Sequence, residues 1–218
     1  MLDKLRETWN SDLYVADFWK PLRKYSTAPY NGGTGLSYGY VNRTVHHSYM
    51  ADPATEIPEF MGKLGLDCSR YTVTLTACRI SNAVRKTEVI GNASLILMIT
   101  GGISNALSIG SSGFQGQGTI NIAIITDITM DDSASMNLFL SICEARAQAL
   151  NDLGIKDRTT GKKAPGTSTD SISLFVGNEK DNSRYGGRLS AIGMATSRLV
   201  YGAVMEALKR DCTESDKQ

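Results

Sequence analysis

Asp127 closes an apolar, β-branched run at residues 120–125, and Thr119 and Asn121 stand near the start of the same run. A carboxylate can transfer protons, while hydroxyl and amide groups hold a ligand through hydrogen bonds. The run itself is typical of a buried strand. Open sheets usually keep their sites at the rim where strands end. We therefore expect the ends of this strand to carry chemistry.

Two further segments are built in the same way. The apolar run at residues 95–99 leads into residues 100–105, Thr-Gly-Gly-Ile-Ser-Asn, and residues 166–170, Gly-Thr-Ser-Thr-Asp, lead into the apolar run 172–176. If the three strands are neighbours, their Thr, Asn and Asp side chains are expected to converge on one pocket. The alternative for residues 166–170 is a turn into the strand, stabilised by Asp and Thr side-chain bonds to the backbone.

Glycines shape two segments, and those of the first can turn backbone amides toward a ligand oxygen. One is Thr100-Gly-Gly102, which is too short for a phosphate-binding loop and has no Lys. The other is residues 26–33, Ser-Thr-Ala-Pro-Tyr-Asn-Gly-Gly, where proline and two glycines shape the backbone. A tight turn between strands is the alternative for the second loop.

Glu144 lies on a predicted helix that Ser133 or Ser135 caps and that runs to about Leu153, stopping at Gly154. A carboxylate at the edge of an apolar stripe is partly desolvated, so it is either paired with a nearby Arg or held with a raised pKa for proton transfer. The predicted stripe consists of Met136, Leu140, Cys143, Ala147 and Leu150.

His46 and His47 end a strand predicted for residues 36–47. Adjacent residues of a strand point to opposite faces, so the two rings are not expected to bind one metal together. A half-exposed structural histidine is the simpler interpretation for each, and a catalytic base is the alternative.

The composition suits one globular domain in the cytoplasm. The chain has 218 residues, of which 41% are hydrophobic and 21% charged, and its formal net charge is +1. This balance gives no support to a nucleic-acid or anionic-membrane partner. No apolar run approaches the roughly 20 residues of a membrane span, and no signal core follows Met1. The cysteines form no Cys-x-x-Cys pair, so reduced thiols are expected rather than a structural zinc site: Cys68, Cys78, Cys143 and Cys212.

Strands mixed with helices predict an α/β or α+β fold: a single domain with a mixed β-sheet flanked by helices. Residues 1–23 are predicted as an N-terminal helical extension, residues 24–210 as the main domain and residues 211–218 as a polar tail. Within the domain we expect a short helix at 55–64, a strand at 71–77 with one buried and one polar face, and a long strand at 89–99 in an antiparallel pair. A last helix is expected at 189–209, with Gly193 and Gly202 marking close approaches.

The motifs together resemble the adenosylcobinamide amidohydrolase family (CbiZ-like) over roughly residues 24–209. Each motif is weak alone, but their order and spacing are specific. They are residues 26–33, 100–106 (Thr-Gly-Gly-Ile-Ser-Asn-Ala), 118–122 (Gly-Thr-Ile-Asn-Ile), 126–127, 144–155 and 166–170.

This resemblance implies hydrolysis of the amide that joins the aminopropanol arm to the corrin ring's propionate side chain. The products would be adenosylcobyric acid and 1-amino-2-propanol, which returns salvaged corrinoid to coenzyme B12 synthesis. The matched carboxylates Asp170, Glu144 and Asp127 are the catalytic candidates, because a pair in different surroundings can supply base and acid. The substrate-binding candidates are Asn31, Gly32, Gly33, Thr100, Gly101, Asn105, Thr119, Asn121, Thr167 and Thr169.

Carboxylate-aided attack by water is favoured over a covalent enzyme, because no Ser or Cys lies in a recognisable nucleophile motif. A threonine nucleophile is the less favoured route. The substrate carries its own cobalt, so no separate cofactor is required, although Asp and Asn oxygens also suit a divalent metal. A non-catalytic corrinoid-binding protein and a hydrolase of another amide are the competing functions. An exposed face of Trp9 and Trp19 would favour a homodimer.

Overall fold

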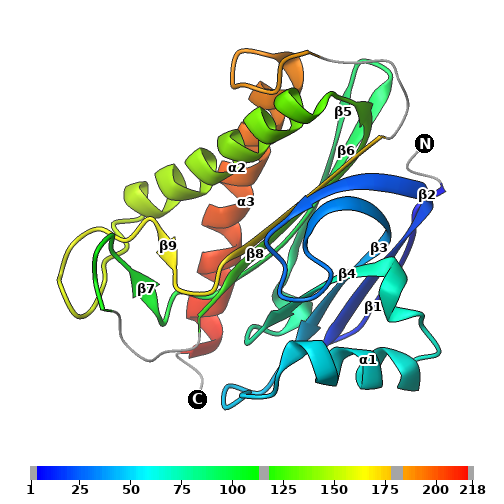
Figure 1. Cartoon of the computed structure of the whole chain (residues 1–218). Helices are drawn as coiled ribbons and strands as arrows, with labels where there is room; N and C mark the ends of the chain where they lie inside the picture. The colour runs from blue at the N-terminus through cyan, green and yellow to red at the C-terminus, as the bar shows by residue number, and fades with distance from the viewer. Residues whose placement is uncertain (1–3, 113–117, 178–183, 216–218) are drawn as a thin grey trace.

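The computed structural model describes residues 4–112, 118–177 and 184–215, which form one mixed α/β domain (Figure 1). Its eight-stranded sheet has the order β4-β3-β2-β10-β8-β6-β5, with β1 pairing to β2, and β7 and β9 form a separate two-stranded sheet. The elements are β1 (Arg6–Trp9), β2 (Leu13–Ser26), β3 (Gly33–Thr44), α1 (Pro53–Lys63), β4 (Tyr71–Thr76), β5 (Val84–Ile90), β6 (Ala93–Gly101), β7 (Ala106–Leu107), β8 (Ile120–Thr129), α2 (Asp132–Asp152), β9 (Gly166–Thr167), β10 (Ser171–Gly177) and α3 (Ala191–Ser215). The predicted fold class is confirmed.

The three segments predicted as neighbours do lie side by side. β8 pairs in parallel with β10 and antiparallel with β6. Their apolar side chains on one face pack against α2 and α3, which cross that face in Figure 1. Burial on both faces explains why these strands read as continuous β-branched runs.

The sheet curls until strands that are distant in its order meet. Asn121 of β8 donates to the carbonyl oxygen of Leu75 on β4 (2.7 Å), although three strands separate β8 from β4. Inside the curl a second apolar cluster joins β2, β3, β6, β8 and β10, with Tyr14, Tyr40 and Phe175 at its centre. Helix α1 covers the outer face of β3 and β4.

The helices predicted within residues 1–23 are wrong, because β1 and the first half of β2 form an antiparallel pair there. The register between β2 and β3 shifts between Asp17 and Leu22, so residues 18–21 lie opposite Tyr38 alone. This bulge, which contains Pro21, interrupts the period of two that would have indicated a strand. The N-terminal segment is therefore part of the sheet.

The strand predicted for residues 89–99 is instead a hairpin of β5 and β6. Its turn contains Gly91, which has a φ of 60°. β4 takes no part in this pair and lies parallel to β3. The threonines of β4, predicted as its polar face, are buried inside the curl: Thr72, Thr74 and Thr76.

Helix α2 stops before Gly154 as predicted, where φ is 69°, but Asp131 caps it instead of a serine. The predicted apolar stripe is wrong in its first half, because Met136 and Leu140 are 62% and 59% exposed, whereas Leu150 is buried as predicted. Most of the buried stripe repeats the predicted spacing two residues later in the helix, so periodicity alone could not choose between the two stripes. The buried stripe includes Leu138, Ile142, Ala145 and Ala149.

Helix α3 begins and ends later than predicted and takes in the first part of the expected tail. A Cβ on Gly193 would lie 2.0 Å from the Gly187 carbonyl oxygen, which confirms a close approach there. Gly202 has open space around it, so that prediction is wrong. Helix α1 confirms the predicted short helix. No helix in the described ranges is long and apolar enough to cross a membrane.

Candidate functional site

One edge of the sheet gathers the predicted polar motifs. Thr100, at the end of β6, is the pairing partner of Asn121, and Asn121 is also the partner of Ser171 at the start of β10. We call this region, with the turns that lead to and from these strand ends, the polar edge. β7 and β9 flank it, as Figure 1 shows.

Asp170 organises the turn before β10. Its Oδ1 accepts hydrogen bonds from the Ile120 amide (2.9 Å) and the Thr167 hydroxyl. Its Oδ2 accepts from the Thr167 amide (3.0 Å) and lies 3.1 Å from Nη1 of Arg146. These four donors occupy the acceptor positions of the carboxylate and hold it at a fixed place.

Arg146 reaches this carboxylate from α2 and was missed as a site residue. Its side chain is 18% exposed and that of Asp170 is 7% exposed, so the ion pair is largely shielded from water. A Cβ at Gly166 would lie 2.5 Å from Oδ2 of Asp170, so the turn needs glycine there. Arg146 belongs to the matched motif that begins at Glu144, which was the available signal.

Threonine and asparagine side chains tie the turns of the polar edge together. Thr119 donates to the Thr169 carbonyl oxygen, and Thr169 donates to the Gly118 carbonyl oxygen, each at 3.0 Å. Asn105 donates to the Ser168 hydroxyl (2.8 Å), and its buried Oδ1 has no partner among the described residues. Thr169 is exposed and Thr167 half-buried, whereas Thr119 and Asn105 are buried.

Asn121 and Thr100 lie deeper, inside the curl. Asn121 donates to Asn42 Oδ1 (3.2 Å) as well as to Leu75, and Asn42 donates to the Thr100 hydroxyl (3.1 Å). Asn121, Thr100 and Asn42 are each at most 1% exposed. The group therefore holds β8, β6, β3 and β4 together. Sequence reasoning missed Asn42 because its contacts depend on the curl.

The loop of residues 26–33 crosses from β10 to β4. Thr27 bonds to Ile172, and Tyr30 bridges Val73. Asn31, with a φ of 49°, donates to the Tyr71 carbonyl oxygen (2.9 Å) and accepts from Lys24 Nζ (2.7 Å). Burial lowers the pKa of Lys24.

The glycines of this loop have different roles. A Cβ on Gly32 would lie 2.4 Å from the Ala28 carbonyl oxygen, so only glycine fits that close approach. Gly33 has a φ of 75° and is exposed. Residues 26–33 are thus a shaped loop, and Gly33 also leads directly into β3 as the turn interpretation expected.

In the other glycine segment, residues 100–102, the backbone already takes part in hydrogen bonds and strand pairing. Gly102 donates its amide to the Thr119 carbonyl oxygen (3.0 Å), and Gly101 pairs with Ile120 in the β6–β8 ladder. Both glycines are buried. These residues fix the strand ends and do not leave both amides free for a ligand oxygen.

Asp127 lies near the opposite end of β8 from Asn121. Its Oδ1 accepts from the Ser94 amide at the start of β6 (2.8 Å), and its buried Oδ2 has no partner among the described residues. Residues 121 and 127 are about 20 Å apart at roughly 3.3 Å per residue. The polar edge does not include Asp127.

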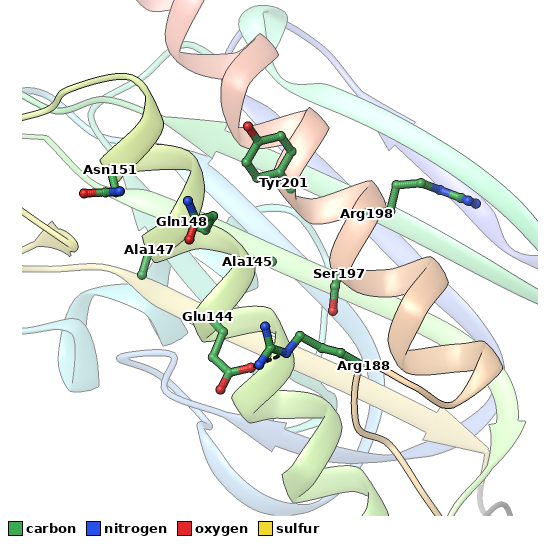
Figure 2. A pocket seen from close by; sticks show the side chains of 9 residues that line it. All are labelled: Glu144, Ala145, Ala147, Gln148, Asn151, Arg188, Ser197, Arg198 and Tyr201. Carbon is green, nitrogen blue, oxygen red and sulfur yellow. Dashed lines mark ion pairs between the residues drawn. The ribbon is translucent and has the colours of Figure 1, made fainter.

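Glu144 lines a groove of about 590 Å³ between α2 and α3 (Figure 2). Its carboxylate pairs with Arg188 at 2.9 Å, and the two side chains are 53% and 65% exposed. Glu144 and Arg146 are two residues apart, which places them about 200° apart around a helix. Of the two interpretations for Glu144, the structure shows the ion pair with an arginine, Arg188. Glu144 lies on a different side of α2 from Arg146, the partner of Asp170.

The two histidines follow β3 and are exposed. Their ring centroids lie 3.9 Å apart, so the prediction that they point to opposite faces is wrong. His46 Nδ1 lies 2.7 Å from the Ser48 hydroxyl. Across the described ranges, no group of three or more His, Cys, Asp or Glu side chains is placed to hold a metal ion.

Among known protein families, a family model matches nearly the whole chain. The family model described as adenosylcobinamide amidohydrolase, CbiZ, matches residues 2–216. The match includes the N-terminal strands, which lay outside the resemblance seen in the sequence.

Two individual proteins are similar over different extents. An uncharacterized protein of Methanocaldococcus jannaschii, MJ1613, is 32% identical over 92 residues, which cover 42% of this chain and 36% of that protein. The crystal structure of the PH0078 protein from Pyrococcus horikoshii shares 10% identity, with a TM-score of 0.43, over 93% of this chain and 78% of that one.

Proposed function

Because the chain belongs to the adenosylcobinamide amidohydrolase family, we propose that it hydrolyses the aminopropanol amide of adenosylcobinamide. The products are adenosylcobyric acid and 1-amino-2-propanol, which serve corrinoid salvage for coenzyme B12 synthesis. The family match over residues 2–216 is the observation that carries this proposal. The polar edge supports it by bringing the Asp170 carboxylate together with the Thr167 and Thr169 segment.

Asp170 is proposed as the carboxylate that takes a proton from the attacking water. The Thr167 hydroxyl donates to Oδ1 of Asp170. Because a hydroxyl hydrogen can rotate about the C–O bond, it can point elsewhere and let a water molecule donate to Oδ1 instead. The contacts with the Thr167 amide and Arg146 remain and keep the carboxylate oriented. A positioned base of this kind typically contributes about 10²–10⁴-fold to a rate.

Thr167 and Thr169 are the predicted binding residues that solvent reaches at this edge, and we propose that they contact the corrinoid's amide groups. The Asn31–Gly33 segment is proposed to contribute from the neighbouring loop. Asn105, Thr119, Thr100, Gly101 and Asn121 are buried, and we assign them the positioning of the strand ends and turns.

Asp127 and Glu144 are placed outside the reaction in this proposal. Asp127 lies near the other end of β8, and Glu144 lies on the exposed groove between the helices. Neither can share a proton-transfer step with Asp170 at these positions.

A second route deserves a direct test because of one contact. The Thr167 hydroxyl donates to Asp170, which Arg146 orients, and this is also the arrangement of a nucleophile and its base. In that route Thr167 forms an ester with the corrin carboxyl group, and aminopropanol leaves before water cleaves the ester.

The proposed reaction is tested by incubating the metal-free protein with adenosylcobinamide and analysing the products by mass spectrometry. Adenosylcobyric acid and aminopropanol in equal amounts are expected. Product that appears only after a divalent metal is restored would show that the protein needs one. Corrinoid binding without product in either case would favour the binding-protein alternative.

We also propose a cellular location, partners and an oligomeric state for the protein. We place the protein in the cytoplasm, with a corrinoid as its partner and no nucleic acid or membrane partner. Trp9 is 50% exposed and Trp19 largely covered, so only Trp9 offers much surface for the proposed homodimer. Light scattering of the purified chain measures that state.

A further inference from the structure

A second pocket, of about 590 Å³, lies where β1, β2, β3 and the start of β4 meet. None of its lining residues belongs to the polar edge. The bulge of β2 at residues 18–21 shapes the pocket, because it brings Phe18 and Trp19 to the wall opposite Tyr38. Bulges are often found next to functional sites, where they redirect side chains.

Three cations line this pocket: Lys4, Arg6 and Arg70. None of them forms an ion pair with another described residue. The Arg70 guanidinium lies over the Tyr38 ring, 4.6 Å from its centroid, which holds it at the pocket wall. The positive charge is therefore available to a ligand.

Asp17 is the one acidic residue among the described residues of the wall. It stands opposite Arg6 in the β1–β2 pairing, yet its carboxylate accepts the hydroxyl of Tyr71. Burial and this hydrogen bond raise the pKa of Tyr71 to about 12, so the hydroxyl stays a donor at neutral pH. Among the described lining residues, three positive charges and one negative charge leave a net charge of +2.

Trp19 supplies an unused donor. Its indole nitrogen is buried and has no hydrogen-bond partner within the described part of the chain. An indole N–H can only donate, and a buried donor without a partner is uncommon in a folded protein. The Trp19 side chain lines the pocket, so its emission can report a ligand that binds there.

We propose that this pocket binds a small molecule carrying a phosphate monoester. A phosphate monoester has a charge of about −1.5 to −2 at neutral pH, which balances the pocket, whereas a single carboxylate would leave half of the charge unbalanced. The guanidinium forks of Arg6 and Arg70 match phosphate oxygens, and Lys4 adds a point charge. The exposed part of Tyr38 offers an aromatic surface to the organic group.

Inorganic phosphate is the probe for the shared chemistry. The chain contains two tryptophans, so Trp9→Phe leaves Trp19 as the only indole reporter. We expect its emission to change saturably with phosphate at constant ionic strength, and calorimetry on the unmodified chain to give the same Kd. The double variant Arg6→Gln/Arg70→Gln should raise this Kd by roughly tenfold or more. Arg158→Gln, which replaces an exposed arginine outside the pocket, should leave it unchanged.

Each alternative result overturns the proposal. These are the absence of saturable binding, a change that sodium chloride reproduces at equal ionic strength, and equal Kd values in the double variant and the Arg158→Gln control. Melting temperatures of both variants are compared first, so that misfolding is not read as lost binding. Hydrolysis of adenosylcobinamide is measured separately and bears only on the other site.

Discussion

Arg146 of α2 and Asp170 before β10 form an ion pair of 3.1 Å that fastens the helical layer to the polar edge of the sheet. The same carboxylate receives the amides of Ile120 and Thr167, so one side chain fixes the start of β8 and the turn into β10. Glu144 lies only two residues from Arg146 but pairs with Arg188 at the surface.

Removing the guanidinium should therefore destabilise the fold. Arg146→Met leaves the Asp170 charge buried without its partner, and we expect the free energy of unfolding to fall by about 3 kcal/mol. Arg188→Met breaks an exposed pair and should cost less than about 1 kcal/mol. Urea denaturation of both variants measures the difference. Equal losses would mean that the Arg146 pair is no more than a surface contact.

Thr167 separates the two chemical routes. With water as the nucleophile, Thr167→Val loses one hydrogen bond to Asp170, and kcat should fall by roughly tenfold or less. With threonine as the nucleophile, kcat should fall by a factor on the order of 10⁴ or more. Rapid quenching and intact-protein mass spectrometry of the unmodified enzyme check the result, because only the second route leaves a corrinoid ester on the chain. Thr167→Ser is the matched control.

Asn121 should contribute to stability more than to binding. Asn121→Ala leaves the Leu75 carbonyl oxygen and Asn42 Oδ1 without a donor inside the curl, and we expect a loss of about 2 kcal/mol or more. Asn151→Ala, on the groove between the helices, should change stability by less than about 0.5 kcal/mol. Thermal denaturation compares the pair. A normal melting temperature with strongly weakened corrinoid binding would contradict the positioning role.

Tyr71 makes stability depend on alkaline pH. Its folded-state pKa of about 12 lies above the ordinary value of 10.0, so its contribution is fully present below pH 10.0 and is lost as the pH rises toward 12. Tyr71→Phe should be less stable than the unmodified chain at pH 8, and the gap between the two should narrow as the pH rises above 10. Unfolding measured at several alkaline pH values checks this. A gap that stays constant would contradict the raised pKa.

The central strands could be predicted because the pattern that indicates each of them lies within a few consecutive residues. Residues 95–99, 120–125 and 172–176 are apolar runs with polar residues at their ends, and the structure places them in β6, β8 and β10. The three strands were expected to be neighbours, which would bring Thr100, Asn121 and the turn of Asp170 together. The pairing of β8 with β6 and with β10 confirms this expectation.

The errors arise where distant parts of the chain decide the structure. The bulge in β2 mimicked helical spacing, and the partners of Asn42 exist only because the sheet curls. In α2 two stripes with the same period compete, and packing on the sheet selects the one that leaves Glu144 at the surface. Arg146 lies in a matched motif and could have been named as a site residue. Its pairing with Asp170 could not be predicted, because the two residues are 24 positions apart in the chain.

The most direct test compares turnover of adenosylcobinamide by Asp170→Asn, Asp127→Asn and Glu144→Gln, with corrinoid affinity measured at equilibrium for each. We predict that Asp170→Asn lowers kcat by about 10²–10⁴-fold while the corrinoid still binds. Asp127→Asn and Glu144→Gln should each stay within roughly threefold of the unmodified enzyme, less than 1 kcal/mol in activation free energy. Near-normal turnover in Asp170→Asn, or its collapse in either of the other two folded variants, would contradict the assignment of hydrolysis to the polar edge.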